Sequence, residues 1–125
     1  DAQVLKAFTE AADYPGPSLI IAYGHCIEHG YELRHGLDQQ KKAVASGYWP
    51  LYRYNPARAA EGKNPLVLDS KAPSLPLADY FALESRYRLL GQGDDAAAEL
   101  LALAQQDVLA HWHRLEHLAA APAGV

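Results

Sequence analysis

The pattern of apolar and polar residues in the first part of the chain predicts a helix, a tight turn and a strand. In Ala2–Ala12 the apolar side chains follow one another at intervals that place them on one helical face. Asp1 is a candidate N-cap for this helix. The turn Tyr14–Pro17 ends it, because proline lacks an amide hydrogen and restricts the residue before it. The short apolar run that follows, Ser18–Tyr23, is typical of a strand buried on both faces.

The middle of the chain predicts a loop, a helix and two extended pieces. Glycines alternate with polar residues from 24 to 36, which favours a loop. Leu37–Ser46 has helical spacing, and Gly47 suits the position just after a helix. Tyr48–Pro56 prefers β-structure, but its prolines restrict it to an edge strand or an extended segment. Pro65–Ser70 is a second short extended run.

The last third predicts two helices, Leu77–Leu90 and a longer one from Asp94 to about Ala121, separated by glycines. We expect them to pack together through Tyr87, Trp112 and their neighbours. The longer helix carries an apolar stripe at steps of three and four residues. The stripe consists of Leu101, Ala104, Val108, Trp112, Leu115 and Ala119. A helix, a tight turn and a buried strand are half of a parallel α/β unit, so the expected class is α/β.

Composition excludes several kinds of function. A chain of 125 residues is long enough for one modest domain, and its net charge of -4 gives no electrostatic reason to expect nucleic acid or an anionic membrane as a partner. No apolar run is long enough to span a bilayer. A single cysteine excludes an intrachain disulfide, which suits a reducing compartment, so a cytoplasmic location is expected.

Two patterns could carry chemistry. Cys26, between His25 and His29, follows the predicted strand, and open α/β sheets bind ligands beyond the carboxyl ends of their strands. Free cysteines usually act as small buried hydrophobes, however, so this pattern alone favours a structural role. His113–His117 matches the H-x-x-E-H zinc-peptidase motif, but no acidic residue or histidine follows to supply a third ligand. A zinc hydrolase is therefore disfavoured.

Longer stretches of sequence are more specific than these short patterns. The distinctive stretches are Tyr14–Tyr23, His25–Ile27, Ser46–Pro56, Gly62–Pro65 and Leu68–Pro73. In this order they resemble pyruvate:ferredoxin (or flavodoxin) oxidoreductase, at the C-terminal end of its thiamine-diphosphate-binding domain. The resemblance covers essentially the whole chain, so residues 1–125 are expected to be the C-terminal portion of one incomplete domain. The fold it implies is a fragment of a three-layer α/β thiamine-diphosphate-binding fold, with a parallel strand and helices, ending in two helices.

The resemblance also implies a reaction and a metal ligand. The family oxidatively decarboxylates pyruvate to acetyl-CoA and CO₂ on thiamine diphosphate. It passes electrons through [4Fe-4S] clusters to ferredoxin or flavodoxin, and a homodimer is expected. Cys26 matches the family's fourth ligand to the cluster nearest the thiamine. The chemistry agrees, because such a cluster takes four thiolates that distant segments commonly supply.

The chain also departs from a complete enzyme. The family's G-D-G stretch for Mg²⁺ and diphosphate is absent, as are the other three cysteine ligands. We therefore expect a fragment that supplies one ligand, Cys26, and no catalytic or cofactor-binding residue, so that it is inactive alone and binds no thiamine diphosphate or Mg²⁺. Much of the sheet should be missing, which would expose the apolar side chains of Ser18–Tyr23. The alternative is a free-standing, non-catalytic α/β interaction module. No chemical role is assigned to Tyr48–Pro56 or Leu68–Pro73.

Overall fold

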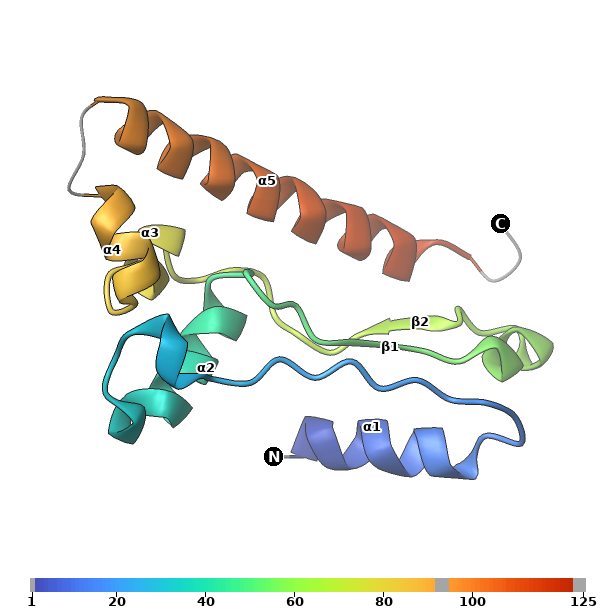
Figure 1. Cartoon of the computed structure of the whole chain (residues 1–125). Helices are drawn as coiled ribbons and strands as arrows, with labels where there is room; N and C mark the ends of the chain where they lie inside the picture. The colour runs from blue at the N-terminus through green and yellow to red at the C-terminus, as the bar shows by residue number, and fades with distance from the viewer. Residues whose placement is uncertain (1, 92–94, 123–125) are drawn as a thin grey trace.

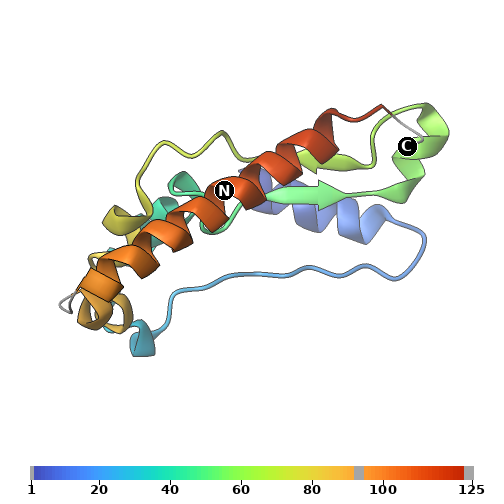
Figure 2. The ribbon, with the colours of Figure 1, turned by 90° about the horizontal axis from the view of Figure 1, so that it is seen from above.

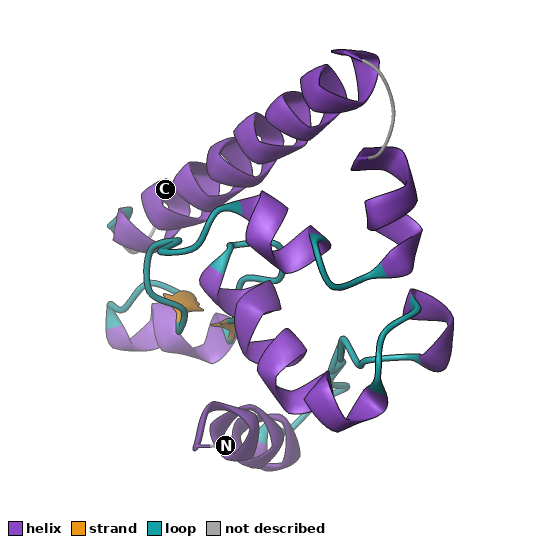
Figure 3. Cartoon of the chain, turned by 90° about the vertical axis from the view of Figure 1, so that its left-hand side faces the viewer, coloured by secondary structure: helices purple, strands orange, loops and turns teal. Residues whose placement is uncertain are grey.

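Helices lie on both sides of a small β-hairpin in the computed structural model, which describes residues 2–91 and 95–122. In Figure 1 the long C-terminal helix runs above the hairpin and the N-terminal helix lies below it. Figure 3 shows that helix dominates the chain and that the strands are short. The helices and strands are α1 (Ala2–Asp13), α2 (Gly36–Ala45), β1 (Tyr52–Tyr54), β2 (Leu66–Leu68), α3 (Leu77–Phe81), α4 (Ser85–Gly91) and α5 (Asp95–Ala120).

The prediction of a buried strand at Ser18–Tyr23 is wrong for the described structure. These residues are extended, but they have no strand paired to them, because β1 and β2 pair only with each other. Leu19 is 83% exposed and Ile21 is 69% exposed, as expected if the rest of a sheet is missing. Figure 2 shows this segment running along one edge of the molecule. The described residues therefore contain no parallel sheet.

The hairpin joins the two extended runs that the sequence predicts. β1 and β2 are antiparallel, with Tyr52 opposite Leu68 and Tyr54 opposite Leu66. Between them lies a 3₁₀ helix, Pro56–Glu61. The Asn55 side chain caps this helix by accepting a hydrogen bond from the amide of Ala57. Among the described residues the hairpin forms a two-stranded sheet of its own.

Arg53 of β1 attaches the hairpin to the N-terminal helix. Its Nε and Nη2 donate to the two carboxyl oxygens of Asp69 at 2.8 and 2.9 Å, and its Nη1 donates to Glu10 of α1. The Asn55 amide donates to the other oxygen of Glu10 at 3.0 Å. These contacts hold α1 beside the hairpin even though Val4, Leu5 and Phe8 on α1 are about half exposed or more.

The single helix predicted at Leu77–Leu90 is divided into two. α3 ends at Phe81 and α4 begins at Ser85, with a tight turn in which the amide of Glu84 donates to the carbonyl of Phe81 at 3.1 Å. The turn allows the side chains of Glu84 and Arg86 to meet, which residues two apart cannot do on a continuous helix. The sequence prediction, which took Leu77–Leu90 as one helix, missed this break.

α5 confirms the long helix predicted from the apolar stripe. Trp112 and Leu115 are buried and the rest of the stripe is half-buried. α5 contacts α3, α4 and β2, and Val108 packs against a core formed by Ala43, Leu77 and Tyr80. No helix in the described ranges is long and apolar enough to cross a membrane.

Two residues fix the ends of helices. Gly47, which follows the C-cap residue Ser46 of α2, has a φ of 78°, as is common just after a helix, and a Cβ there would lie 2.7 Å from Pro73. Asn64, at the hairpin connection, donates from its amide to the carbonyls of Leu118, Ala119 and Ala121 at 2.7–3.1 Å. The C-terminal end of α5 is thereby capped by a side chain from the hairpin.

Candidate metal-ligand turn at Cys26

Cys26 lies where the extended segment ends and the chain turns. Its thiol is free and exposed, and its backbone is extended. The carbonyl of Cys26 accepts from the amide of His29 at 3.1 Å, and the carbonyl of Ile27 accepts from Gly30 at 3.0 Å. We call residues 26–30 the Cys26 turn. Its position confirms that Cys26 follows an extended run directly, although that run is not paired as a strand.

The first residue of α4 holds the far end of this turn. Ser85 Oγ donates to the carbonyl of Gly30 at 2.7 Å, and the Ser85 amide donates to the same oxygen at 3.3 Å. Gly30 has a φ of 75°, and a Cβ at this position would lie 2.6 Å from Ser85 Cβ. The turn therefore requires glycine both for its backbone angle and for the close approach of α4.

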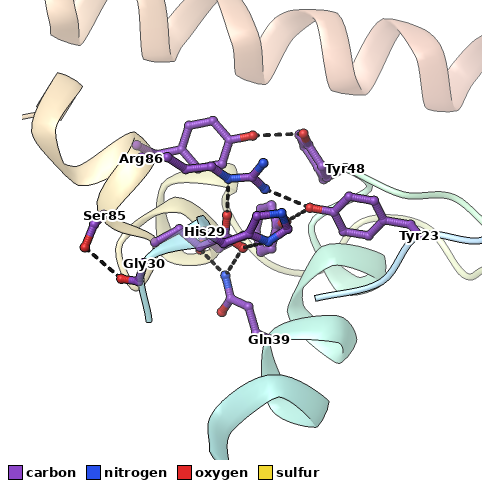
Figure 4. Close-up of polar contacts among 10 residues, drawn as sticks. Tyr23, His29, Gly30, Gln39, Tyr48, Ser85 and Arg86 are labelled. Atoms are coloured by element: carbon purple, nitrogen blue, oxygen red, sulfur yellow. Dashed lines mark hydrogen bonds and ion pairs between the residues drawn. The ribbon is translucent and has the colours of Figure 1, made fainter. Parts of the chain in front are cut away.

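A buried carboxylate lies beside the same turn. Glu84 is only 1% exposed. Its Oε1 accepts from Gln39 of α2 at 2.9 Å, and its Oε2 accepts from Arg86 Nε at 2.5 Å. His29 Nδ1 lies 3.9 Å from Oε1. Figure 4 shows His29, Gln39 and Arg86 converging on this site from three separate segments. Hydrogen bonds from a cation and an amide offset the cost of burying the carboxylate.

Tyr23 fixes the segment just before the turn. Its hydroxyl shares a hydrogen bond with that of Tyr80 at 2.8 Å and accepts another from Arg86 Nη2 at 2.8 Å. Its ring stacks on Trp49 and His29, with centroids 5.0 and 6.1 Å apart. Burial is the largest cause of the raised pKa of Tyr80, and the bond to Tyr23 raises that pKa further.

Gln40 of α2 also contacts the backbone on this side. In the orientation that satisfies its neighbours, its amide nitrogen donates to the carbonyl of Tyr23 at 3.0 Å. Its oxygen accepts from the amide of His25 at 2.8 Å. The chain is thus fixed on both sides of Cys26 while the thiol itself stays exposed.

Sequence reasoning did not find the residues that hold the turn. Glu84, Ser85 and Arg86 lie more than fifty residues beyond Gly30, so no local pattern links them to it. The sequence offered no signal for this contact, because a Glu and an Arg two residues apart are ordinary on a continuous helix, where they face different sides.

The other candidate ligands do not form a metal site in the ranges that the structure describes. No three His, Cys, Asp or Glu side chains lie together there as a metal ion requires. In the zinc-peptidase motif, His113 Nδ1 lies 3.4 Å from Glu116 on an exposed face of α5, and His117 is also exposed. The ring of His25 packs against Gly36.

One exposed thiol fits a [4Fe-4S] cluster only in part. Such a cluster takes four thiolates, and this chain has one cysteine. The free, exposed thiol of Cys26 suits a ligand that completes a cluster held mainly by other segments. The other thiolates of such a cluster would have to come from other segments, because this chain offers a single cysteine.

Comparison with known proteins identifies what the chain is similar to. No protein-family model matches it. It is 49% identical over 120 residues to pyruvate-flavodoxin oxidoreductase of Rhodospirillum rubrum and 50% identical over 121 residues to that of Trichormus variabilis. It is 48% identical over 118 residues to pyruvate:ferredoxin oxidoreductase of Moorella thermoacetica.

These matches cover 94–96% of the chain but 10% of each relative. The relatives named for flavodoxin and the relative named for ferredoxin are matched almost equally well. The resemblance stated from the sequence is confirmed: over nearly its whole length the chain is similar to one segment of proteins named pyruvate-flavodoxin or pyruvate:ferredoxin oxidoreductase.

Proposed function

We propose that this chain is the part of a pyruvate:ferredoxin or pyruvate:flavodoxin oxidoreductase that supplies Cys26 as one ligand to a [4Fe-4S] cluster. The observation that carries the proposal is the free thiol of Cys26, exposed on a turn whose two sides are fixed. The high identity to such enzymes across nearly the whole chain supports it. When bound, the cluster accepts and passes on single electrons.

The chain's own residues have a limited share in the proposed reaction. Cys26 provides a thiolate, and the contacts of Tyr23 and Gly30 set where it is presented. The groups that bind pyruvate, thiamine diphosphate with Mg²⁺, and coenzyme A belong to other segments of the enzyme. The final acceptor would be ferredoxin or flavodoxin.

The exposed apolar residues support a place within a longer polypeptide. Leu19 and Ile21 on the extended segment are largely exposed, as is Leu5 on α1. An open groove of about 1320 Å³ lies between α1, residues 17–23 and residues 48–56. Such surface suits burial against another part of the same enzyme. A non-catalytic module would use the same surface, so the test must concern the metal rather than the surface.

Replacing Cys26 with alanine in the complete enzyme is the deciding test. Removal of one thiolate should make one cluster labile, so that iron per protomer falls by the content of about one cluster and ferredoxin reduction collapses. Pyruvate decarboxylation should persist, because its groups lie elsewhere. Ile27→Ala, a change at an exposed neighbour in the same turn, is the matched control and should keep full iron. Full iron and near-normal ferredoxin reduction in Cys26→Ala would refute the assignment.

A further inference from the structure

The Cys26 turn is held by residues far away in the chain, and no sequence pattern predicted this contact. Three consecutive residues, Glu84, Ser85 and Arg86, contact the chain on both sides of the thiol. Ser85 binds Gly30, four residues after Cys26, and Arg86 binds the hydroxyl of Tyr23, three residues before it. Glu84 lies between them and accepts from Arg86.

The contact of Ser85 is the most direct of the three. Its hydroxyl and its amide both donate to one carbonyl oxygen, that of Gly30. The missing side chain of Gly30 leaves room for this approach, since a Cβ there would lie 2.9 Å from Ser85 Oγ. Within the turn, the amide of His29 donates to the carbonyl of Cys26, and the amide of Gly30 donates to the carbonyl of Ile27. A displacement of Gly30 would therefore move the backbone that carries the thiol.

We propose that Ser85 is a positioning residue for Cys26: by holding the Gly30 carbonyl it fixes the turn that presents the thiol to the cluster. This inference rests on the proposed function, in which Cys26 is a ligand. Ser85 acts on Cys26 through the turn, by the two hydrogen bonds that it donates to the Gly30 carbonyl. The break between α3 and α4 serves this role, because it places the first residue of α4 against Gly30.

The first experiment concerns the turn alone and needs no metal. In the 125-residue chain, Ser85→Ala should speed amide hydrogen exchange at His29 and Gly30 by roughly tenfold, the factor expected for loss of one typical hydrogen bond. Ser85→Thr keeps the hydroxyl and should restore slow exchange. Ser18→Ala is the matched control, because Ser18 Oγ also donates to a backbone carbonyl, that of Ala11, but far from the turn. Unchanged exchange in Ser85→Ala would show that Ser85 does not hold the turn.

The second experiment concerns the cluster in the complete enzyme. Ser85→Ala should leave the iron content as isolated nearly unchanged, but a ferrous chelator should remove iron from one cluster several times faster. The electron paramagnetic resonance spectrum of that reduced cluster should broaden, because the thiolate takes more than one position. Ser85→Thr should restore both, and Ser18→Ala should alter neither.

The outcomes separate this inference from the ligand assignment. Faster amide exchange with an unaltered spectrum and unaltered iron release would overturn the positioning role while leaving Cys26 as a ligand. A full iron content in Cys26→Ala would instead overturn the ligand assignment, whatever Ser85→Ala does to exchange at the turn.

Discussion

Glu84 is buried, and each of its carboxyl oxygens has its own hydrogen-bond donor. Both of its carboxyl oxygens accept hydrogen bonds inside the protein, from Gln39 and Arg86, and water cannot replace them because the side chain is buried. Glu84→Gln keeps the shape but removes the charge and turns one acceptor into a donor facing Arg86. We expect it to lower the free energy of unfolding by about 1–3 kcal/mol, the usual cost of leaving a buried polar group unsatisfied.

Urea unfolding of Glu84→Gln, Arg86→Met and the double variant measures this effect. If the two side chains interact, the double variant should lose less stability than the two single changes added together. Additive losses would show that Glu84 and Arg86 act independently. Lys63→Met is a suitable control, since its ion pair with Glu61 is exposed and should contribute little.

At the scale of elements, α1 is attached to the hairpin by charge as well as by packing. Hydrogen bonds from Asn55 and Arg53 hold the pKa of Glu10 below its usual value, and hydrogen bonds from Arg53 hold that of Asp69 low. Depressed pKa values in the folded state mean that the stabilisation is complete at neutral pH and is lost as pH falls below about 4. We expect α1 to separate from the hairpin below about pH 4, before α5 unfolds.

Amide hydrogen exchange in α1 and α5, followed from pH 7 to pH 3, tests this separation. Exchange in α1, corrected for the intrinsic effect of pH, should accelerate first. Arg53→Met should make α1 exchange quickly at pH 7 and abolish the additional acceleration in acid. An acid response that stays the same in Arg53→Met would contradict the role of these carboxylates.

The sequence predicted correctly the elements that depend on neighbouring residues, and it failed where an element depends on residues far away in the chain. α1, α2 and α5 were predicted because their spacing and end residues are local, as at Gly47. The pairing of β1 with β2 was not predicted, because its register depends on two strands that are separate in the sequence. The prediction of a buried strand at Ser18–Tyr23 was wrong because burial needs neighbouring strands, and residues 2–91 and 95–122 provide none for it. The assignment of Cys26 as a ligand stays a prediction: its local pattern favoured a structural role, and only the sequence stretches shared with a family pointed to a ligand.

At the scale of the whole molecule, the extended segment leaves apolar surface uncovered. Leu19 and Ile21 are two residues apart, so they lie on the same side of an extended backbone. Replacing both with serine should reduce self-association of the 125-residue chain and its binding of a hydrophobic dye, with little change in the unfolding midpoint. The same double change should destabilise the complete enzyme if its other segments cover this surface.

Sedimentation and dye fluorescence of the isolated chain, together with thermal unfolding of the complete enzyme, measure the two effects. Glu28→Ser, at an exposed position of the Cys26 turn, is a control for surface changes that remove no apolar group. A complete enzyme that tolerates serine at both Leu19 and Ile21 would show that this surface stays exposed in the assembly.

The contact between Ser85 and Gly30 has a consequence for the order of folding. Fifty-five residues separate the two partners, so a long loop must close before the hydrogen bond can form. Cys26 is synthesised before Ser85, and contacts of such long sequence separation form slowly. Under the proposed role of Ser85, the Cys26 thiol reaches its final position only after this loop has closed, and a cluster delivered before then would meet a cysteine that is not yet held in place.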